Sequence, residues 1–237
     1  MVKIQKRTES NISVWFKHLD ESLKHGHKPR ENMPYVTISR ESGAYGNTIA
    51  YMLAEYMQKR ERRQDAFWAV FDKELMKKVM DENKFPEGYK KYLDESAVPA
   101  IQDIVGEILG VHPPHETLVR KISETIFHLA WLGNVILVGQ GANIITQRLP
   151  RGVHVRLVAS LENRVKHMQD IMDISEKEAR DYVIKEDRNR HEYIKRYFHK
   201  DINDVSLYDI IINLDTVALE DAVRAIGEMV FKGNETL

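Results

Sequence analysis

The chain has 237 residues, of which 43% are hydrophobic and 30% are charged, and its formal net charge is -1. This length suits one large α/β domain or two small ones, and the near-zero charge excludes a global attraction to nucleic acid. The absence of cysteine excludes disulfides, thiolate metal sites and cysteine nucleophiles. No apolar run reaches the ~20 residues that a membrane span needs, and the N-terminus does not resemble a signal peptide, so we expect a cytoplasmic protein without a membrane partner.

The first part of the chain is predicted to contain a helix, a strand, a tight loop and a second helix. Residues 8–24 show the spacing of a short amphipathic helix, and a polar link runs from His25 to Pro34. Tyr35–Ser39 is a β-rich run, and Thr48–Lys59 carries apolar residues at helical spacing. The segment between those two contains two glycines, which is typical of a tight turn.

The middle of the chain is predicted to be mainly helical. Phe67–Phe71 is a second short apolar run, and Asp72 stands at the start of a charged helix that ends near Met80. Residues 83–96 are polar and contain proline and glycine, which indicates a loop. Two helices are then predicted, Val98–Leu109 and Glu116–Leu132.

The last part of the chain is predicted to alternate strands with helices. The strands are Asn134–Gly139, Val153–Ala159 and Tyr208–Leu214. The helices are Leu161–Ile171, Ser175–His199, which is one long helix or a bent pair, and Val217–Phe231. Ser175 with Glu178 forms a capping box at the start of the second. Because the connections are too long for hairpins, this order favours a parallel sheet with helices on both faces. Ligands of such sheets bind at the carboxyl ends of the strands.

The loop after the first strand is the first candidate site. Ser39–Thr48 reads Ser-Arg-Glu-Ser-Gly-Ala-Tyr-Gly-Asn-Thr, between a strand and a helix. Unpaired N–H groups at a helix N-terminus attract phosphate, and glycine lets the backbone approach it. The segment departs from the G-x-x-x-x-G-K-[ST] signature, because Arg40 stands at the first glycine and Gly46 at the lysine. The alternative interpretation is a glycine-containing turn that binds nothing.

Several segments in one order resemble the cytidylate kinase-like family, a group of divergent relatives of bacterial cytidylate kinase that lack the loop lysine. "TISRESGAYGNTIAYMLAE" resembles the family's first strand and phosphate loop, over residues 37–55. The other matching segments are "FDKEL" at 71–75, "VILVGQGANII" at 135–145, "HVRLVASLENRVKHM" at 154–168, Asp187-x-x-Arg190-x-x-Tyr193, and "YDIIINLD" at 208–215. The resemblance covers roughly residues 34–230.

The resemblance implies a three-layer α/β fold of the P-loop, nucleoside-monophosphate-kinase type, with a five-stranded parallel sheet and a helical lid. Residues 1–33 would form an N-terminal helix and linker, and residues 34–237 the kinase-like domain. Within that domain the resemblance implies a helical insertion at about 83–132 and a lid at about 175–203. It also implies ATP as donor, Mg²⁺, and a nucleotide or similar small phosphorylated ligand as acceptor.

Site residues are carried over from the family by matching position. Arg40 would act on the donor phosphates, with a loop of Ser42, Gly43, Ala44, Tyr45, Gly46, Asn47 and Thr48, where Thr48 could also contact Mg²⁺. Asp72, Gln140 and Gly141 would line the acceptor side. Arg188 and Arg190 would belong to the lid.

Departures from the family pattern leave alternatives open. Gln140 replaces an arginine that grips the acceptor phosphate in true cytidylate kinases, and Asn47 stands where relatives often carry arginine. Arg40 or the lid arginines must therefore supply the charge of the missing lysine. The interleaved acidic residues of 175–199 also fit a merely solvated helix, and Asp72 also fits a helix N-cap.

The sequence thus predicts an ATP-dependent phosphotransferase. The alternative is a catalytically weak or inactive nucleotide-binding protein with a regulatory or interaction role. A homodimer through the N-terminal helix and the 98–132 helices is a further expectation. Trp15 and Phe16 would dock that N-terminal helix on the core or on a second subunit.

Overall fold

A computed structural model describes residues 33–61, 67–74 and 116–235, together with Trp15, Lys17 and Met76. The predicted loop at 83–96 and helix Val98–Leu109 lie outside the described residues, as does most of the predicted helix at 8–24. Within the described ranges, no helix has the length and apolar character that crossing a membrane requires.

The core of the molecule is a five-stranded sheet in the order β2-β3-β1-β4-β5, and every pair of neighbouring strands is parallel. The strands are β1 (Tyr35–Arg40), β2 (Ala69–Phe71), β3 (Val135–Val138), β4 (Gly152–Val158) and β5 (Ile210–Asn213). β1 is central, with Ile38 aligned to Val138 on one side and to Val155 on the other. Since all strands run the same way, the loops that follow them meet at one edge of the sheet.

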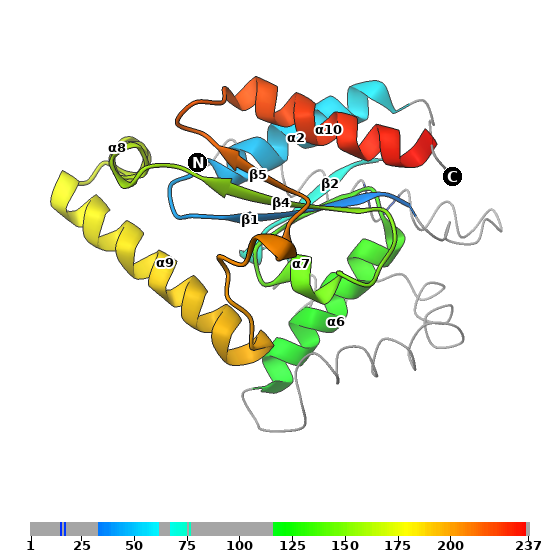
Figure 1. The fold of residues 1–237 in the computed structure, drawn as a ribbon, viewed down its shortest axis with the longest axis horizontal. Coiled ribbons are helices and arrows are strands. Elements are labelled where there is room, and N and C mark those ends of the chain that lie inside the picture. The colour runs from blue at the N-terminus through cyan, green and yellow to red at the C-terminus, as the bar shows by residue number, and fades with distance from the viewer. Residues whose placement is uncertain are drawn as a thin grey trace.

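Helices cover both faces of this sheet (Figure 1). One face carries α2 (Gly46–Arg60) and α10 (Leu219–Glu235), which lie side by side. The other face carries α6 (Glu116–Leu132) and the short α7 (Ala142–Ile145). The three layers follow from the buried strands, which must hide apolar side chains on both sides.

Side chains alternate along the strands between two apolar cores. Val36 and Ile38 of β1 pack with α2 and α10, whereas Tyr35 packs with α6 and α7. Trp15 is buried in the second core, with its ring 5.5 Å from that of Phe71. This contact agrees with the expectation that an N-terminal aromatic residue docks on the core.

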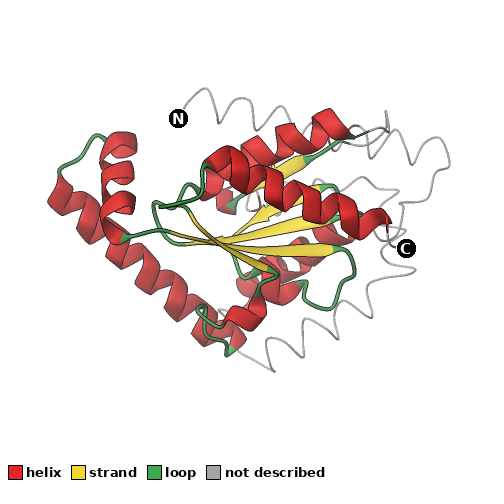
Figure 2. Ribbon diagram, turned by 45° about the horizontal axis from the view of Figure 1, so that its top comes forward, coloured by secondary structure: helices red, strands yellow, loops and turns green. Residues whose placement is uncertain are grey.

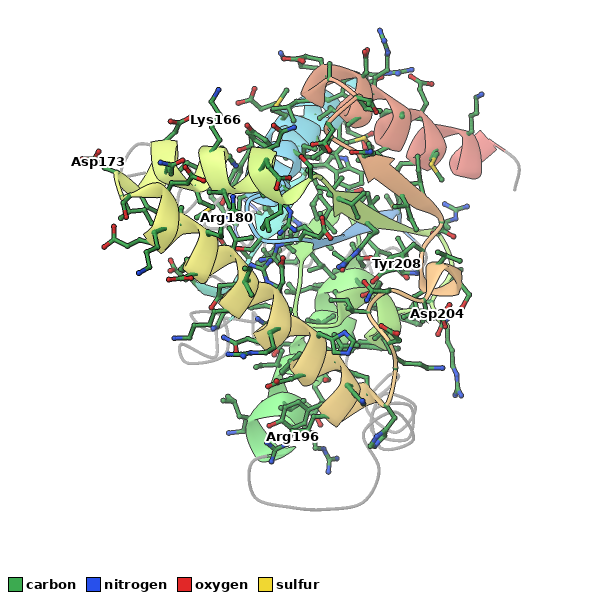
Figure 3. The ribbon with its side chains drawn as sticks, turned by 60° about the vertical axis from the view of Figure 1, so that its left-hand side comes forward. Lys166, Asp173, Arg180, Arg196, Asp204 and Tyr208 are labelled. Carbon is green, nitrogen blue, oxygen red and sulfur yellow. The ribbon has the colours of Figure 1, made fainter. Side chains whose placement is uncertain are left out.

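A helical hairpin of α8 (Leu161–Met172) and α9 (Glu176–Phe198) extends beyond the sheet (Figure 2). Val165, Ala179 and Val183 form a small apolar core between the two helices. Figure 3 labels Asp173, which lies at the turn between them. Ile194 and Phe198, near the C-terminal end of α9, pack in the same apolar core as Tyr35, α6 and α7. They anchor the base of the hairpin to the sheet.

Most predicted elements are present, with small changes at their ends. The capping box at the start of α9 is confirmed, with Ser175 and Glu178 bonding reciprocally. Sequence reasoning missed α7 and the 3₁₀ turn η1 (Val205–Leu207), because such short elements carry no detectable apolar period.

Candidate functional site

The loop between β1 and α2 presents unpaired backbone donors. Tyr45 caps α2 in a left-handed conformation, with φ of 51°, and no side chain caps the helix. Among the described residues, no acceptor is found for the N–H groups of Gly43, Tyr45, Gly46, Asn47 and Thr48. Together with the positive end of the α2 dipole, these donors form a cradle for an anion.

One amide of this loop is already bound by the hairpin. The Ser42 N–H donates to the Asp187 carboxylate of α9 over 2.6 Å. Arg164 of α8, which is only 8% exposed, donates to the other Asp187 oxygen over 2.5 Å and to the Ser42 carbonyl over 3.2 Å. A negative charge therefore lies directly beside the loop that is expected to bind phosphate.

Helix α8 also supports the tip of the loop. The His167 ring bonds the Gly43 carbonyl through Nδ1 over 2.7 Å, and the Tyr45 ring stacks on it with centroids 3.5 Å apart. Gly43 has φ of 83°, and a Cβ there would come within 2.6 Å of the Arg164 carbonyl oxygen. Only glycine therefore fits at this position without moving α8.

Arg40 runs from β1 across the loop to the end of β3. A Cβ on Gly46 would lie 2.7 Å from Arg40 Cγ, and a Cβ on Gly139 would lie 2.1 Å from Arg40 Nη1. Within the described part of the chain, the Arg40 guanidinium makes no hydrogen bond and no ion pair. Both glycines are thus needed to make room for this one side chain.

Burial and the nearby Arg190 lower the pKa of Arg40 to about 9, although Asp72 acts in the opposite direction. Arginine keeps its proton in proteins, so the lowered pKa does not mean that Arg40 is neutral. It means that the positive charge of Arg40 lies where burial and Arg190 destabilise it. A bound anion would relieve that cost. Burial also lowers the pKa of Arg190, whose Nη1 donates to the Arg40 carbonyl over 3.2 Å.

Arg156 is a third arginine near Arg40 and Arg190, and it was not predicted from the sequence. Arg156 of β4 is only 6% exposed, and its Nη1 donates to Ser39 Oγ over 2.9 Å. Its guanidinium lies 5.9 Å from the centre of the Tyr208 ring. No carboxylate pairs with Arg156 among the residues described. A charged residue inside an apolar strand was the available signal, but only the sheet shows which way it points.

Arg40 and Arg190, but not Arg156, border a cavity of about 550 Å³ at the carboxyl edge of the sheet. Its charged lining residues are Arg40, Lys73, Glu186 and Arg190. Apolar side chains from α6, α7 and α9 and from the 202–208 segment also line it, together with polar groups such as Asn143 and Asn189. The volume is typical of a small-molecule site.

The turn after β3 forms another part of the cavity wall. Gly139, Gln140 and Gly141 have φ of 81°, 58° and 74°, so each is in the left-handed region. The N–H groups of Gln140 and Gly141 have no acceptor within the described ranges. Successive free amides in such a turn form a concave surface that favours anions.

Some of the residues named from sequence line the cavity, whereas the loop residues Ser42–Thr48 and Asp72 do not. Arg40, Gln140, Gly141 and Arg190 all line the one cavity. Arg188 is exposed and does not line it, so its assignment to a phosphate stays a prediction.

Asp72 accepts a hydrogen bond from the Glu74 N–H over 3.1 Å, as an N-cap residue does. Its negative charge also acts on Arg40, so both interpretations of Asp72 stay open.

The residues present suit a Mg²⁺ ion whose ligands come mainly from the phosphates of a bound nucleotide and from water. No group of His, Asp and Glu residues that could hold a metal occurs in the described part of the chain. Thr48 is exposed at the start of α2, where its hydroxyl is free to face a bound triphosphate. Mg²⁺ often keeps several waters and takes its remaining ligands from substrate phosphates.

The parallel sheet order, the loop with free amides after β1 and the hairpin beside it define an α/β protein with the kinase-like, P-loop type of fold. The sequence model of the cytidylate kinase-like family matches residues 35–216, and the chain belongs to this family.

Of two similar solved structures, the first shares the fold of this chain. An uncharacterized protein from Eubacterium ventriosum has a TM-score of 0.65 and 20% identity, over 85% of this chain and 99% of that one. Shikimate kinase from Bacteroides thetaiotaomicron has a TM-score of 0.46 and 14% identity, over 84% and 99% of the two chains. No curated protein matches the chain.

Proposed function

We propose that this protein is an ATP-dependent phosphotransferase that acts on a small phosphorylated acceptor, such as a nucleotide, in the cytoplasm. The observation that carries the proposal is the junction of two anion-binding features at Arg40. The loop with free amides begins directly after this residue, and its guanidinium lines the cavity together with Arg190. Phosphoryl transfer needs this arrangement of positioning and positive charge, and little covalent chemistry from the protein.

The donor triphosphate would lie on the free amides of the Gly43–Thr48 segment, with Mg²⁺ on its oxygens and near Thr48. ATP supplies the phosphoryl group: an acceptor oxygen bonds to the γ-phosphorus as the bond to the β–γ bridging oxygen breaks and ADP leaves. Because Gly46 replaces the lysine, Arg40 and Arg190 supply positive charge around the transferred group. Both guanidiniums line the cavity, and Arg40 is also the residue directly before the loop.

The test is a screen of nucleotides by thermal shift, with and without Mg²⁺, followed by a search for ATP turnover with the ligands that bind. We expect a rise in melting temperature with MgATP and ADP formation with at least one phosphorylated acceptor. Binding without turnover, across the full set of nucleoside monophosphates and simple phosphomonoesters, would contradict catalysis.

One observation favours the alternative of a weak or inactive nucleotide-binding regulator. The Asp187 carboxylate occupies the Ser42 amide and brings a negative charge to the loop, which opposes a triphosphate. The same thermal-shift screen separates the two functions, since a regulator would bind nucleotide without turnover. Absence of any shift with any nucleotide would contradict both.

A further inference from the structure

Glu186 of α9 places a negative charge in the lining of the cavity. The other charged residues that line it are Arg40, Lys73 and Arg190, which are all cationic. Burial has the largest effect on the pKa of Arg40 and of Arg190 and lowers both, whereas the Glu186 charge acts on each in the opposite direction. The Glu186 carboxylate is therefore within electrostatic reach of both guanidiniums. A ligand that carries only negative charge would be repelled by this carboxylate.

The Glu186 carboxylate has spare hydrogen-bonding capacity. Its only hydrogen bond to the described residues comes from Asn189 Nδ2 over 3.4 Å, which is a long contact. Arg190 lies one helical turn further on, at a spacing that permits an ion pair, but Arg190 pairs with Asp187 at 3.9 Å instead. An ionised carboxylate offers about four acceptor sites, so Glu186 is able to accept further hydrogen bonds from a ligand.

Asn143 of α7 adds a second acceptor to the cavity wall. It lines the cavity and is only 6% exposed. Its Nδ2 donates to the Leu207 carbonyl over 3.3 Å, and this bond fixes which end of the amide is the oxygen, because a carbonyl only accepts. Oδ1 accepts no hydrogen bond from the part of the chain that the structure describes. Two acceptors with free capacity, Glu186 and Asn143, favour a ligand that carries hydroxyl donors.

The charge of Glu186 also bears on which oxygen of an acceptor attacks the donor. A phosphate oxygen is already anionic at neutral pH, so a carboxylate beside it repels it and has no proton to remove. A hydroxyl oxygen carries a proton that must leave during the attack, and a nearby carboxylate is a suitable base for it. Asp72 does not line the cavity and caps the Glu74 amide. In the described part of the chain, Glu186 is the only carboxylate that lines the cavity.

We propose that Glu186 is a catalytic base and that the phosphoryl acceptor attacks through a hydroxyl group. This assignment rests on the proposed function and narrows its acceptor to a small phosphorylated molecule that also bears hydroxyl groups. The hydroxyl oxygen bonds to the γ-phosphorus, the bond from that phosphorus to the β–γ bridging oxygen breaks, and ADP leaves. The hydroxyl proton passes to a Glu186 carboxylate oxygen, and the product is a new phosphate ester rather than a diphosphate. Asn143 Oδ1 accepts a hydrogen bond from a second hydroxyl group.

Binding without ATP tests the class of ligand. Isothermal titration of the full-length protein with ribose 5-phosphate, glycerol 3-phosphate and inorganic phosphate compares the same anionic group with and without hydroxyl groups. We expect at least one of the two esters to bind at least about tenfold more tightly than inorganic phosphate. Glu186→Gln should weaken the binding of that ester about threefold to tenfold, because a charge-assisted hydrogen bond becomes a neutral one. Inorganic phosphate should bind Glu186→Gln no less tightly than the wild type, since a repulsive charge is lost.

Glu192 provides the matched control for this substitution. It is an exposed glutamate on the same helix and does not line the cavity. Glu192→Gln should change the affinity for either ester by less than about twofold. Esters that bind no more tightly than inorganic phosphate, or an ester affinity that Glu186→Gln leaves unchanged or raises, would overturn the inference.

Turnover with MgATP tests the base and keeps the inference separate from the proposed function. Glu186→Gln should lower kcat about a hundredfold to ten-thousandfold and change the KM for MgATP by less than about threefold. Glu186→Asp retains a carboxylate and should lose less of kcat. Phosphorus NMR should identify the product as a second phosphate ester; a diphosphate product, or equal kcat in the wild type and Glu186→Gln, would overturn the inference. A wild-type protein that binds the esters but forms no ADP would contradict the proposed function, and the titrations would still decide whether Glu186 binds a hydroxyl group.

Discussion

At the residue scale, the side chain of Arg40 fills the space that a side chain on residue 46 would need. This explains why the loop has glycine where the phosphate-loop signature has lysine. The Arg40 stem lies where any side chain on residue 46 would begin, 2.7 Å from the position of its Cβ. A lysine at residue 46 would therefore displace Arg40 from Gly139. The chain carries its positive charge on β1 instead of on the first turn of α2.

Gly46→Ala should act on the cavity through Arg40. We expect the added methyl group to displace the guanidinium and to weaken the binding of inorganic phosphate about as much as Arg40→Met does, by ~1.5–3 kcal/mol. Isothermal titration of the two single variants and the double variant measures this. If the mechanism is correct, the double variant is no weaker than either single variant; additive losses would show that Gly46 acts independently of Arg40.

At the scale of elements, the α8–α9 hairpin is tied to the phosphate loop through Asp187. Its carboxylate joins the Ser42 amide of the loop to Arg164 of α8, which is almost fully buried. The contact stabilises the hairpin against the loop but adds a negative charge where a triphosphate would bind. Binding and stability should therefore respond to Asp187 in opposite directions.

Asp187→Asn keeps an acceptor for the Ser42 amide while removing the charge. We expect MgATP affinity to rise about threefold to tenfold at constant ionic strength, because a repulsive charge is lost. The free energy of unfolding should fall by about 1 kcal/mol, because buried Arg164 loses its closer ion pair and keeps only the one with Glu41. Titration calorimetry and urea unfolding measure the two effects, and unchanged MgATP affinity would show that the carboxylate does not oppose the donor.

The start of α9 gives a second prediction at this scale. Ser175→Ala removes the capping box with Glu178 and should cost ~1 kcal/mol, localised to the first turn of the helix. Amide hydrogen exchange should become faster for residues 177–180. Ser175→Thr retains the hydroxyl and should exchange like the wild type; equal exchange in all three proteins would exclude a role for this cap.

At the scale of the whole molecule, two histidines link folding to pH. Burial lowers the pKa of His128 on α6 to about 4, and burial also lowers the pKa of His154 on β4, although Asp209 acts in the opposite direction. Both side chains are therefore neutral in the folded protein at a pH where they are protonated in the unfolded chain. The unfolded state binds more protons below pH ~6.5, so stability must fall as the pH falls.

We expect the free energy of unfolding to be constant above pH ~6.5 and to fall as the pH drops toward 4. His128 alone should contribute about 1–2 kcal/mol of loss between pH 7 and pH 5. Urea unfolding at several pH values measures the slope, and His128→Gln should reduce it because the titrating group is absent. A wild-type slope that His128→Gln leaves unchanged would show that His128 titrates alike in both states.

Much of the fold could be predicted because its signals are local. The apolar runs of β1, β3 and β4, the capping box of α9 and the alternation of strands with helices all depend on neighbours within a few turns. The parallel sheet followed from connection lengths. The short α7 could not be predicted, since four residues show no apolar period and the Gly141 turn before them lies against the distant Phe198 ring.

The sequence by itself determined the element order, the position of the glycine-containing loop after β1, and the candidate residues Arg40, Gln140 and Arg190. Only the tertiary structure decided where their side chains meet. Arg40 could be named from its place beside the glycines, but its direction depends on Gly139, 99 residues away in the chain. The role of Arg156 and the Asp187–Ser42 contact could not be predicted from the sequence for the same reason, since their partners are distant in the chain. Such contacts join residues distant in sequence, and no local spacing encodes which side chains a folded sheet brings together.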